Sequence, residues 1–514
     1  MKRGSITPFC AMMLMIVAAF VLTLLESARV NGLAHFARLK ANAAIDSVCA
    51  EYQPLLWQQY GLLFLDGAYG TEEFSISYVL EHLDTYMEMG SGNAGTIQEV
   101  FSGLNLFGVK KGDVLLEGYA LATDSEGELF LNYVAEREKE NLSITVAADV
   151  YQEYKKGNEL TQLHGGVEES IVKAQRVIGE VKSDWIVKWE LEKKKEELEE
   201  KPEESEEGAI EFYLPDTSGV EGVLDRAETM FFNGILNMIF TDSDKISTTV
   251  SKPESHLQFR EKEEGNMHLK TSDDWYQRIL VLSYLERYFS NYVHAKEDHF
   301  LTYEMEYVLC GNHTERENLA ETLEKIMLIR EAANVAHVLQ DKEKMEIVAG
   351  LAEVIGFMAG GNPAVVKVVE AGLVGAWAYM ESVLDVRSLV AGEEISLIKN
   401  EEEWTTTLSG ILAVFDKATK ARPCENGLGY TDYLKQLLCL TEKQQLAYRM
   451  MEVMEMGMRS REVFANSQMD HMLVMLRCKL NFESKPLFSS LVSLGDVYRG
   501  NYYFVNEVER SYVP

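Results

Sequence analysis

The sequence predicts a mainly α fold with small β elements (α+β), in which a long N-terminal helix carries a helical ectodomain. Three observations lead to this fold class. The first is an uncharged apolar run at residues 6–25, the second is an apolar stripe with helical spacing directly after it, and the third is a set of long helical patterns later in the chain. Short apolar runs between turn signals supply the β elements.

The apolar run at residues 6–25 (ITPFCAMMLMIVAAFVLTLL) has the length of a membrane-spanning helix. Because a helix rises about 1.5 Å per residue, roughly 20 residues cross the ~30 Å hydrocarbon core of a bilayer. A cleaved secretory signal is the competing interpretation, but it normally has a shorter apolar region and a small-residue cleavage site. Here Glu26 stands where a small residue is needed. We therefore predict a transmembrane helix at residues 5–25, in contact with the lipid bilayer through residues 6–25.

The charges that flank the anchor discriminate little between its two orientations. Lys2 and Arg3 precede it, and Arg29, Arg38 and Lys40 follow it. A lone N-terminal anchor before a large polar domain usually leaves its short head in the cytoplasm. We therefore expect a single-pass protein of the cell membrane with a cytoplasmic N-terminus and an extracellular ectodomain.

A later apolar segment, at residues 347–384, is not predicted to cross the membrane. Four charged residues interrupt it, and so does the turn sequence Gly360-Gly361-Asn362-Pro363. This pattern indicates two buried helices joined by a turn.

Composition limits the class of protein further. Of the 514 residues 46% are hydrophobic and 10% aromatic, which is enough for two to three domains with real cores. The formal net charge of −33 argues against nucleic acid, or an anionic lipid surface, as a partner, because both are polyanions. The six cysteines contain no CxxC pair and predict neither a zinc site nor a dense disulfide framework. Cys424 and Cys439 could pair across a loop, but buried thiols are the expected state.

A stripe of apolar and small residues from Leu33 to Tyr52 predicts an amphipathic stalk helix at residues 26–53, which Pro54 ends. Anchor and stalk can then form one long helix, as in pilin-like subunits. A plain signal-anchor followed by a linker helix fits the same pattern, and the residues alone leave both open.

The ectodomain divides into a mixed α/β region at residues 54–190, a charged linker at 191–209 and a mainly helical region at 210–514. Apolar runs at 60–67 and 114–121 predict strands in the first region. The linker combines high charge with Pro202.

The region at 210–514 begins with a mixed segment at residues 210–270, after which long helices are predicted, and the C-terminal third of the chain is predicted to be essentially helical. Capping boxes at Thr314-x-x-Glu317 and Thr441-x-x-Gln444 each open an apolar-periodic run. The methionines between residues 450 and 458 predict an adaptable core stripe.

No catalytic, cofactor-binding or metal-binding residue is predicted. The sequence Gly90-Ser91-Gly92-Asn93-Ala94-Gly95 matches G-x-G-x-x-G but follows a helical pattern where the dinucleotide fingerprint requires a strand. His294 and His299 are five residues apart, and this spacing fits no metal-binding helix. We therefore expect a protein that is not an enzyme, although a hydrolase site assembled from distant residues would leave no local signature.

Local strings along nearly the whole chain resemble an uncharacterised family of single-span proteins of Gram-positive anaerobes, often encoded with tight-adherence (Tad) pilus machinery. The strings are Gly4-Ser5-Ile6-Thr7, Leu25-Glu26-Ser27-Ala28-Arg29, Glu51-Tyr52, Tyr60-Gly61-Leu62, Tyr303-Glu304-Met305-Glu306-Tyr307 with Gly311 and Asn318-Leu319, Arg330-Glu331 with Asn334, Ala376-Trp377-Ala378-Tyr379-Met380-Glu381-Ser382 with Asp385-Val386-Arg387, and Gly427-Leu428-Gly429-Tyr430-Thr431-Asp432-Tyr433-Leu434.

This resemblance implies a TadE/TadG-like, pseudopilin-type component, either minor pilin-like or an assembly factor, whose partners are other membrane proteins of the pilus or secretion system. It implies a short basic leader at residues 1–4 and candidate processing between Gly4 and Ser5. Pilin-like chains carry a glutamate at the fifth mature position, where this chain has Phe9, so the buried carboxylate–amine pair of a filament cannot form there. Glu26 resembles a glutamate similarly placed in TadE-like chains. A cell-surface adhesin or binding module with an N-terminal anchor is the alternative.

The predicted topology is testable with intact protoplasts. Added protease should digest the chain after Glu26, because the lone apolar run places that region outside the membrane. Immunoblotting for the ectodomain measures the digestion, and a full-length species that survives until the protoplasts are lysed would contradict the topology.

Overall fold

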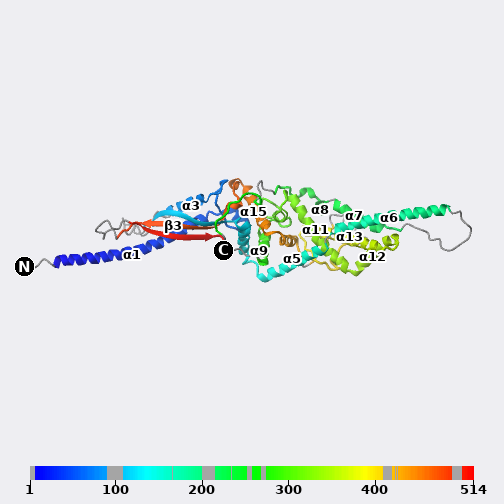
Figure 1. Cartoon of the computed structure of the whole chain (residues 1–514), viewed down its shortest axis with the longest axis horizontal. Coiled ribbons are helices and arrows are strands. Elements are labelled where there is room, and N and C mark those ends of the chain that lie inside the picture. Colours follow the sequence, from blue (N-terminus) through cyan, green and yellow to red (C-terminus); the bar gives the residue numbers. More distant parts are fainter. Residues whose placement is uncertain are drawn as a thin grey trace, which may run out of the picture. The chain divides into compact units, whose positions relative to one another are not determined.

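A computed structural model describes residues 6–89, 108–164, 166–198, 215–232, 234–251, 257–267, 274–408, 419–422, 424, 427–488 and 500–513. It confirms the predicted class, mainly α with a small antiparallel sheet (Figure 1). The chain forms two compact units. Unit 1 comprises residues 1–140, 255–273 and 443–514, and unit 2 comprises 141–254 and 274–442.

These units differ from the division made by sequence. The predicted linker at 191–209 connects two parts of unit 2, and its first residues continue helix α6 (Val167–Leu198). Lys and Glu favour helix formation, so charge alone did not end this helix. Pro202 and the rest of the segment lie outside the described residues. Unit 1 is made of three separate segments of the chain. Local composition does not show which distant segments pack together, so this division could not be predicted from the sequence.

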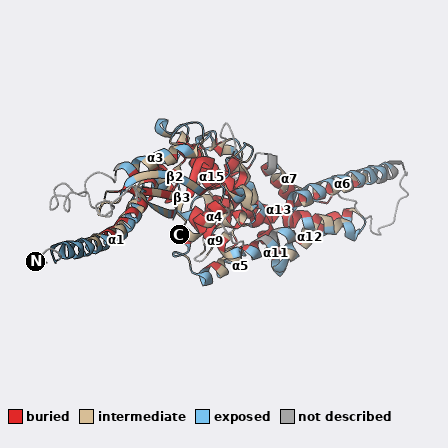
Figure 2. Cartoon of the chain, turned by 60° about the vertical axis from the view of Figure 1, so that its left-hand side comes forward, coloured by how far each residue is buried: buried red, intermediate tan, exposed pale blue. Residues whose placement is uncertain are grey.

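The first element of unit 1 is the long helix α1 (Ile6–Cys49). It joins the predicted anchor and stalk without a break but ends at Cys49, four residues before the predicted end at residue 53. Pro54 does not stop this helix and is instead the first residue of α2 (Pro54–Tyr60), under a Gln53 cap. The first half of α1 is exposed and the second half is packed into unit 1 (Figure 2). The predicted stripe is confirmed by burial of Leu33, Ala37, Ala41, Ala44, Ile45 and Val48.

A four-stranded antiparallel sheet supports this second half of α1. Its strands are β1 (Leu65–Asp66), β2 (Lys110–Leu121), β3 (Met472–Ser484) and β4 (Tyr502–Ser511), and β3 pairs with all three others. α1 and α3 (Ile76–Met89) pack on the sheet over a shared apolar core, which includes Cys478, Leu480 and Phe482 of β3. Figure 1 shows these elements together.

The strand predictions were partly right. The run at 114–121 lies in β2, whereas of the run at 60–67 only Leu65–Asp66 is a strand, because Tyr60 ends α2. The prediction of a helical C-terminal end was wrong, since β3 and β4 lie there. The first half of β3 (MLVML) is buried on both faces and lacks alternation, so it cannot be told from a buried helix by periodicity.

Further helices complete unit 1. They are α4 (Glu128–Glu138) and α15 (Lys443–Arg459), with single 3₁₀ turns at Ser125–Gly127, Glu462–Phe464 and Met469–His471. The methionine stripe of α15 is buried, which confirms it as core. α15 begins at Lys443, one residue later than the capping box at Thr441 requires.

Unit 2 is helical and is built around α13 (Pro363–Val390), which is buried over most of its length. The helices α6, α7 (Ser218–Phe232), α11 (Glu315–Gln340) and α12 (Lys342–Met358) pack against it. The remaining elements are α5 (Ile144–His164), α8 (Ile235–Ile239), α9 (Trp275–Tyr288), α10 (Glu304–Cys310), α14 (Tyr430–Leu438) and a 3₁₀ turn at Ser243–Lys245.

Two local predictions in unit 2 are confirmed. The capping box of Thr314 and Glu317 opens α11. Residues 347–384 form the end of α12, a turn, and α13, which begins at Pro363 under an Asn362 cap.

Two described helices are long and apolar enough to cross a membrane, α1 and α13. The apolar window of α1 has no buried residue, whereas that of α13 is 56% buried. The apolar composition of α13 is therefore accounted for by its place in the core of unit 2. All six cysteines are free, Cys424 and Cys439 included.

Candidate functional site

The first candidate site is the junction at which α1 meets the rest of unit 1. Along α1, Glu26 is the first buried residue, and it directly follows the apolar run. Arg29 lies one turn further and is also buried. Their side chains form an ion pair with a Nη1 to Oε1 distance of 3.0 Å.

The carboxylate of Glu26 is fully engaged by the chain that follows β3. It accepts hydrogen bonds from the backbone N–H of Leu487 at 3.2 Å and of Phe488 at 2.7 Å. The attraction between two buried charges alone would not offset the cost of removing them from water. Here the backbone hydrogen bonds to Glu26 add to that attraction.

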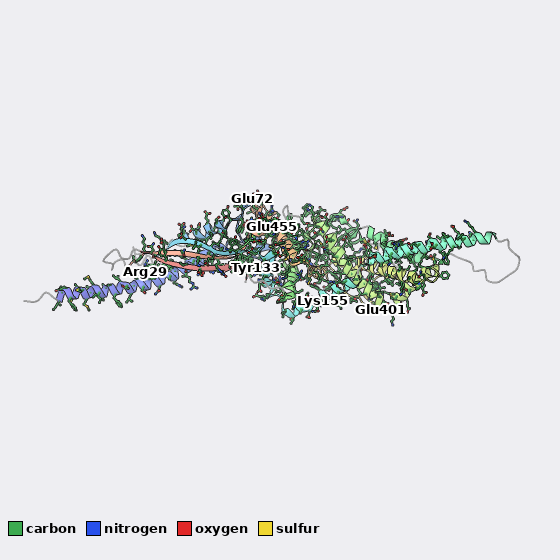
Figure 3. The ribbon with its side chains drawn as sticks, in the orientation of Figure 1. Arg29, Glu72, Tyr133, Lys155, Glu401 and Glu455 are labelled. Carbon is green, nitrogen blue, oxygen red and sulfur yellow. The ribbon has the colours of Figure 1, made fainter. Side chains whose placement is uncertain are left out.

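Arg29 completes the junction from the other side. Its guanidinium donates to the Lys485 carbonyl at 3.1 Å and to the Ser484 hydroxyl at 2.9 Å, and Ser484 donates to the Gly108 carbonyl at 2.8 Å. Figure 3 shows Arg29 where α1 passes the end of the strands. One turn of α1 thus binds the end of β3 and the chain that follows it, and Ser484 links this junction to the chain entering β2.

A second set of contacts holds the C-terminal end of α1. Arg510 of β4 donates to Asp46 at 2.5 Å and to Asn42 at 3.0 Å. The Tyr512 hydroxyl donates to the Cys49 carbonyl at 2.5 Å. The stalk half of α1 is therefore fixed to the sheet at both of its ends.

The second candidate site is a buried ionic network in unit 2. Arg330 of α11 and Asp385 of α13 are completely buried and form an ion pair at 2.8 Å. Arg330 also donates to the Ser396 carbonyl at 2.8 Å and to the Tyr433 hydroxyl at 2.9 Å, and Asn334 donates to Asp385 at 2.9 Å. Burial acts to raise the pKa of Asp385, but the charges of Arg330 and Lys399 outweigh it, so that the pKa lies below its usual value.

Lys399 extends this network to a loop. Its ammonium group pairs with Asp385 at 2.5 Å and with Glu381. Glu381 in turn accepts the backbone N–H of Thr405 at 3.0 Å and of Thr406 at 2.8 Å. The network therefore fixes the backbone of residues 405–406.

Thr405 and Thr406 line a cavity with a volume of about 630 Å³. Trp377 and Trp404 form part of its wall, and both indole N–H groups donate to Thr406. The His337 ring stacks on the Trp404 ring with the two centres 4.6 Å apart, and the Lys344 ammonium lies 5.1 Å from the centre of the Trp404 ring. The remaining lining residues include Val223, Asp341, Ile347, Leu351, Glu401 and Arg422.

The loop between α9 and α10 is held by three buried glutamates. Glu304 accepts from Ser290 N–H at 2.8 Å, Glu306 from Tyr292 N–H at 2.8 Å, and Glu315 from Tyr303 N–H at 2.8 Å. Glu306 also accepts from the Tyr430 hydroxyl at 2.8 Å. Burial raises the pKa of Glu306 to about 7, and its second oxygen has no hydrogen-bond partner within the described residues.

The two histidines singled out in the sequence lie on this loop and not on a helix. His294 contacts the Thr431 hydroxyl at 3.3 Å, and His299 contacts Glu304 at 2.8 Å. Within the described ranges no three His, Cys, Asp or Glu side chains gather as metal ligands. Gly4, Ser5 and the sequence Gly90–Gly95 lie outside the described residues.

The structure brings several of the family-like strings together. Arg330, Asn334 and Asp385, from two strings, share hydrogen bonds, as do Glu306 and Tyr430 from two others. Sequence reasoning missed Lys399 and Ser484, which lie in ordinary loop or strand contexts. A local signal for such residues is a charged residue at an apolar position. Arg29, on the apolar face of the stalk, is an example.

Comparison with known proteins places the chain in a family of unknown function. Residues 215–484, more than half of the chain, match the family of unknown function DUF5702, so the chain belongs to this family. The match begins beyond α1, includes the network of unit 2 and ends at Ser484. No curated protein and no solved structure matches the chain.

Replacement of Glu26 by Ala should destabilise unit 1 by about 3–5 kcal/mol, because Arg29 would stay buried without its carboxylate. The double change Glu26→Leu with Arg29→Met should cost much less, since no charge stays buried. Pulse labelling of the buried Cys478 thiol during a urea titration in detergent measures this loss. Glu72→Ala, an exposed site in unit 1, is the matched control, and equal midpoints for Glu26→Ala and Glu72→Ala would contradict the prediction.

The raised pKa of Glu306 should make unit 2 less stable as pH rises. The folded state holds the proton up to about pH 7, whereas the ordinary carboxyl pKa is 4.5, so the free energy of unfolding falls between these values and levels off above. Between pH 5.5 and 8 this fall should be about 2 kcal/mol, and Glu306→Gln should remove it. Burial also raises the pKa of Glu331, to about 8. This group lowers the free energy of unfolding further as pH rises, and it does so equally in the unchanged protein and in Glu306→Gln.

Urea unfolding followed by tryptophan fluorescence measures this effect, since five of the six tryptophans lie in unit 2. The exposed Glu297→Gln on the same loop is the control. A pH dependence that is the same in Glu306→Gln and Glu297→Gln would show that Glu306 does not titrate as expected.

Proposed function

We propose that this protein is a non-enzymatic, membrane-anchored extracytoplasmic component of a Tad-type pilus or secretion system, acting as a minor pilin-like subunit or an assembly factor. The observation that carries the proposal is the contrast between the two halves of α1. One half presents apolar side chains outward, and the other is built into a folded unit.

The exposed half supports a permanent membrane anchor. Side chains such as Ile6, Leu14 and Phe20 are 76%, 71% and 65% exposed. A continuous apolar surface of this length is unfavourable in water and favourable in lipid or in a bundle of like helices. The apolar helix of an assembly subunit would lie in one of these two environments.

The packed half supports retention of that anchor. Glu26 and Arg29 are bound to the ends of the strands, so a cut near residues 26–28 would remove a buried carboxylate from its donors. A secretory signal has no reason to be built into the fold of the mature protein. These contacts favour an anchor over a cleaved signal.

The arrangement also supports the pilin-like variant of the proposal. A continuous helix whose second half packs on an antiparallel sheet is the architecture expected for a pilin-like subunit. Phe9 argues for a minor or assembly role, because the chain cannot make the carboxylate–amine pair that joins subunits along a filament.

A second candidate function is a surface-anchored binding module, and the cavity in unit 2 favours it. The cavity has the volume of a small-molecule site, combines apolar walls with charged groups at Lys344, Glu401 and Arg422, and is positioned by a buried network. Binding of a cell-wall fragment or glycan at this cavity, without co-purification of pilus proteins, would support the module instead.

Affinity purification of the full chain from detergent-solubilised membranes tests the proposal. The pilus ATPase platform or the major pilin should co-purify, and they should do so less with Glu26→Ala than with the exposed control Glu72→Ala. Electron microscopy of sheared filaments, labelled for the ectodomain, gives the second measurement. Label at bases or tips is expected, whereas continuous labelling would show a major subunit and overturn the assembly role. Absence of every pilus protein would overturn the proposal itself.

A further inference from the structure

A small cavity of about 200 Å³ lies beside the junction of α1 and the sheet. Arg29, Lys110 and Lys485 contribute three positive charges to its lining, and Glu483 contributes one negative charge. The neutral lining residues are Gly108, Ser484, Pro486, Leu487 and Asn501. Such a positive surplus is exceptional in a chain with 82 acidic and 49 basic residues.

The two lysines keep their charges available. Within the described part of the chain, no carboxylate lies within ion-pair distance of Lys110 or Lys485, and both side chains are exposed. By contrast, the neighbouring Lys111 is paired with Asp84 at 2.5 Å and with Glu88 at 3.3 Å. Lys110 lies opposite Glu483 in the sheet, but that carboxylate accepts a hydrogen bond from the Asn501 amide at 2.8 Å.

Arg29 has a different role in this cavity. Its guanidinium donates to Glu26, Ser484 and Lys485, so its charge is largely offset by Glu26. It fixes the backbone on which Lys485 stands. The free donors of the cavity are therefore the two ammonium groups.

The cavity lies at a defined level along the anchor. The apolar run ends at Leu25, and Arg29 follows four residues later, about 6 Å along the helix axis. The polar headgroup layer of a bilayer is roughly 5–8 Å thick on each side. When residues 6–25 span the hydrocarbon core, the cavity lies among headgroups. Tyr503 of β4, 71% exposed and paired with Glu483, adds an interfacial aromatic side chain at the same end of the sheet.

We infer that this cavity binds the phosphate of one anionic phospholipid headgroup, with Lys110 and Lys485 as its donors. The inference rests on the proposed membrane anchoring. The net charge of −33 opposes recruitment of the whole protein to an anionic surface, as the sequence indicated, but the anchor already places the cavity at the headgroups. Only local contacts are then required, and ammonium groups bind phosphate oxygens through charge-assisted hydrogen bonds.

The test uses the full chain purified in dodecyl maltoside and titrated with dioleoyl-phosphatidylglycerol, with bound lipid counted by native mass spectrometry. One phosphatidylglycerol should be retained in preference to phosphatidylcholine. The double variant Lys110→Gln with Lys485→Gln should weaken this binding by about 30-fold, at roughly one factor of five per lysine.

Two control variants separate a specific site from general charge. Lys155→Gln with Lys188→Gln removes two exposed lysines of unit 2 and should leave phosphatidylglycerol binding unchanged. Lys110→Arg with Lys485→Arg retains both charges and should keep most of the affinity. Equal retention of the two lipids, or equal loss in the Lys155 and Lys110 double variants, would overturn the inference.

A competition experiment with inorganic phosphate distinguishes a lipid headgroup from free phosphate as the ligand. If it displaces the lipid at equal concentration, the cavity is a site for free phosphate and the lipid assignment is wrong. A chain that needs detergent for extraction but shows no lipid preference would refute this inference alone. A chain released from membranes by high salt would instead refute the anchoring on which it depends.

Discussion

The buried pair of Glu26 and Arg29 is the interaction on which the arrangement of unit 1 depends. Without contacts at this point, the exposed apolar half of α1 would move freely relative to the folded part of the unit. Here one turn of α1 binds three backbone groups and a hydroxyl at the ends of the strands. The charges are satisfied by hydrogen bonds, and for this reason they can be tolerated in a buried position. The direction of the exposed half of α1 is thereby coupled to the direction of the sheet.

Unit 2 uses the same physical principle for a different purpose. Arg330, Asp385, Lys399 and Glu381 form a chain of alternating charges inside a helical core. Removal of Asp385 would leave Arg330 buried without its carboxylate, and removal of Lys399 would leave Glu381 buried without its cation, so the network specifies how α11, α13 and the loop at 396–406 fit together. The cavity beside Trp404 exists because this loop is held in place. A binding role for unit 2 and a structural role for the network are therefore compatible.

The sequence predicted those elements whose signals are local. The apolar run, the stalk stripe at Leu33 to Val48 and the capping box at Thr314 each depend on residues within two or three turns, and all are found as predicted. The first half of strand β3 was missed because Met472 to Leu476 are buried on both faces and show no alternation, whereas its second half, Arg477 to Ser484, does carry an alternating pattern that sequence analysis overlooked. The junction was only hinted at by Glu26, because the donors that give this residue its role lie about 460 positions later.

The sequence by itself determined that the chain carries a long apolar N-terminal helix, that its fold is mainly helical and that its composition is strongly acidic. These properties follow from residue type and spacing, which act over a few residues. Only the tertiary structure decided that residues 443–514 return to the N-terminal unit, that Arg330 meets Asp385 and that Lys110 and Lys485 face one cavity. Such contacts join positions far apart in the chain, and their energies depend on burial and on exact partners, which no local pattern encodes.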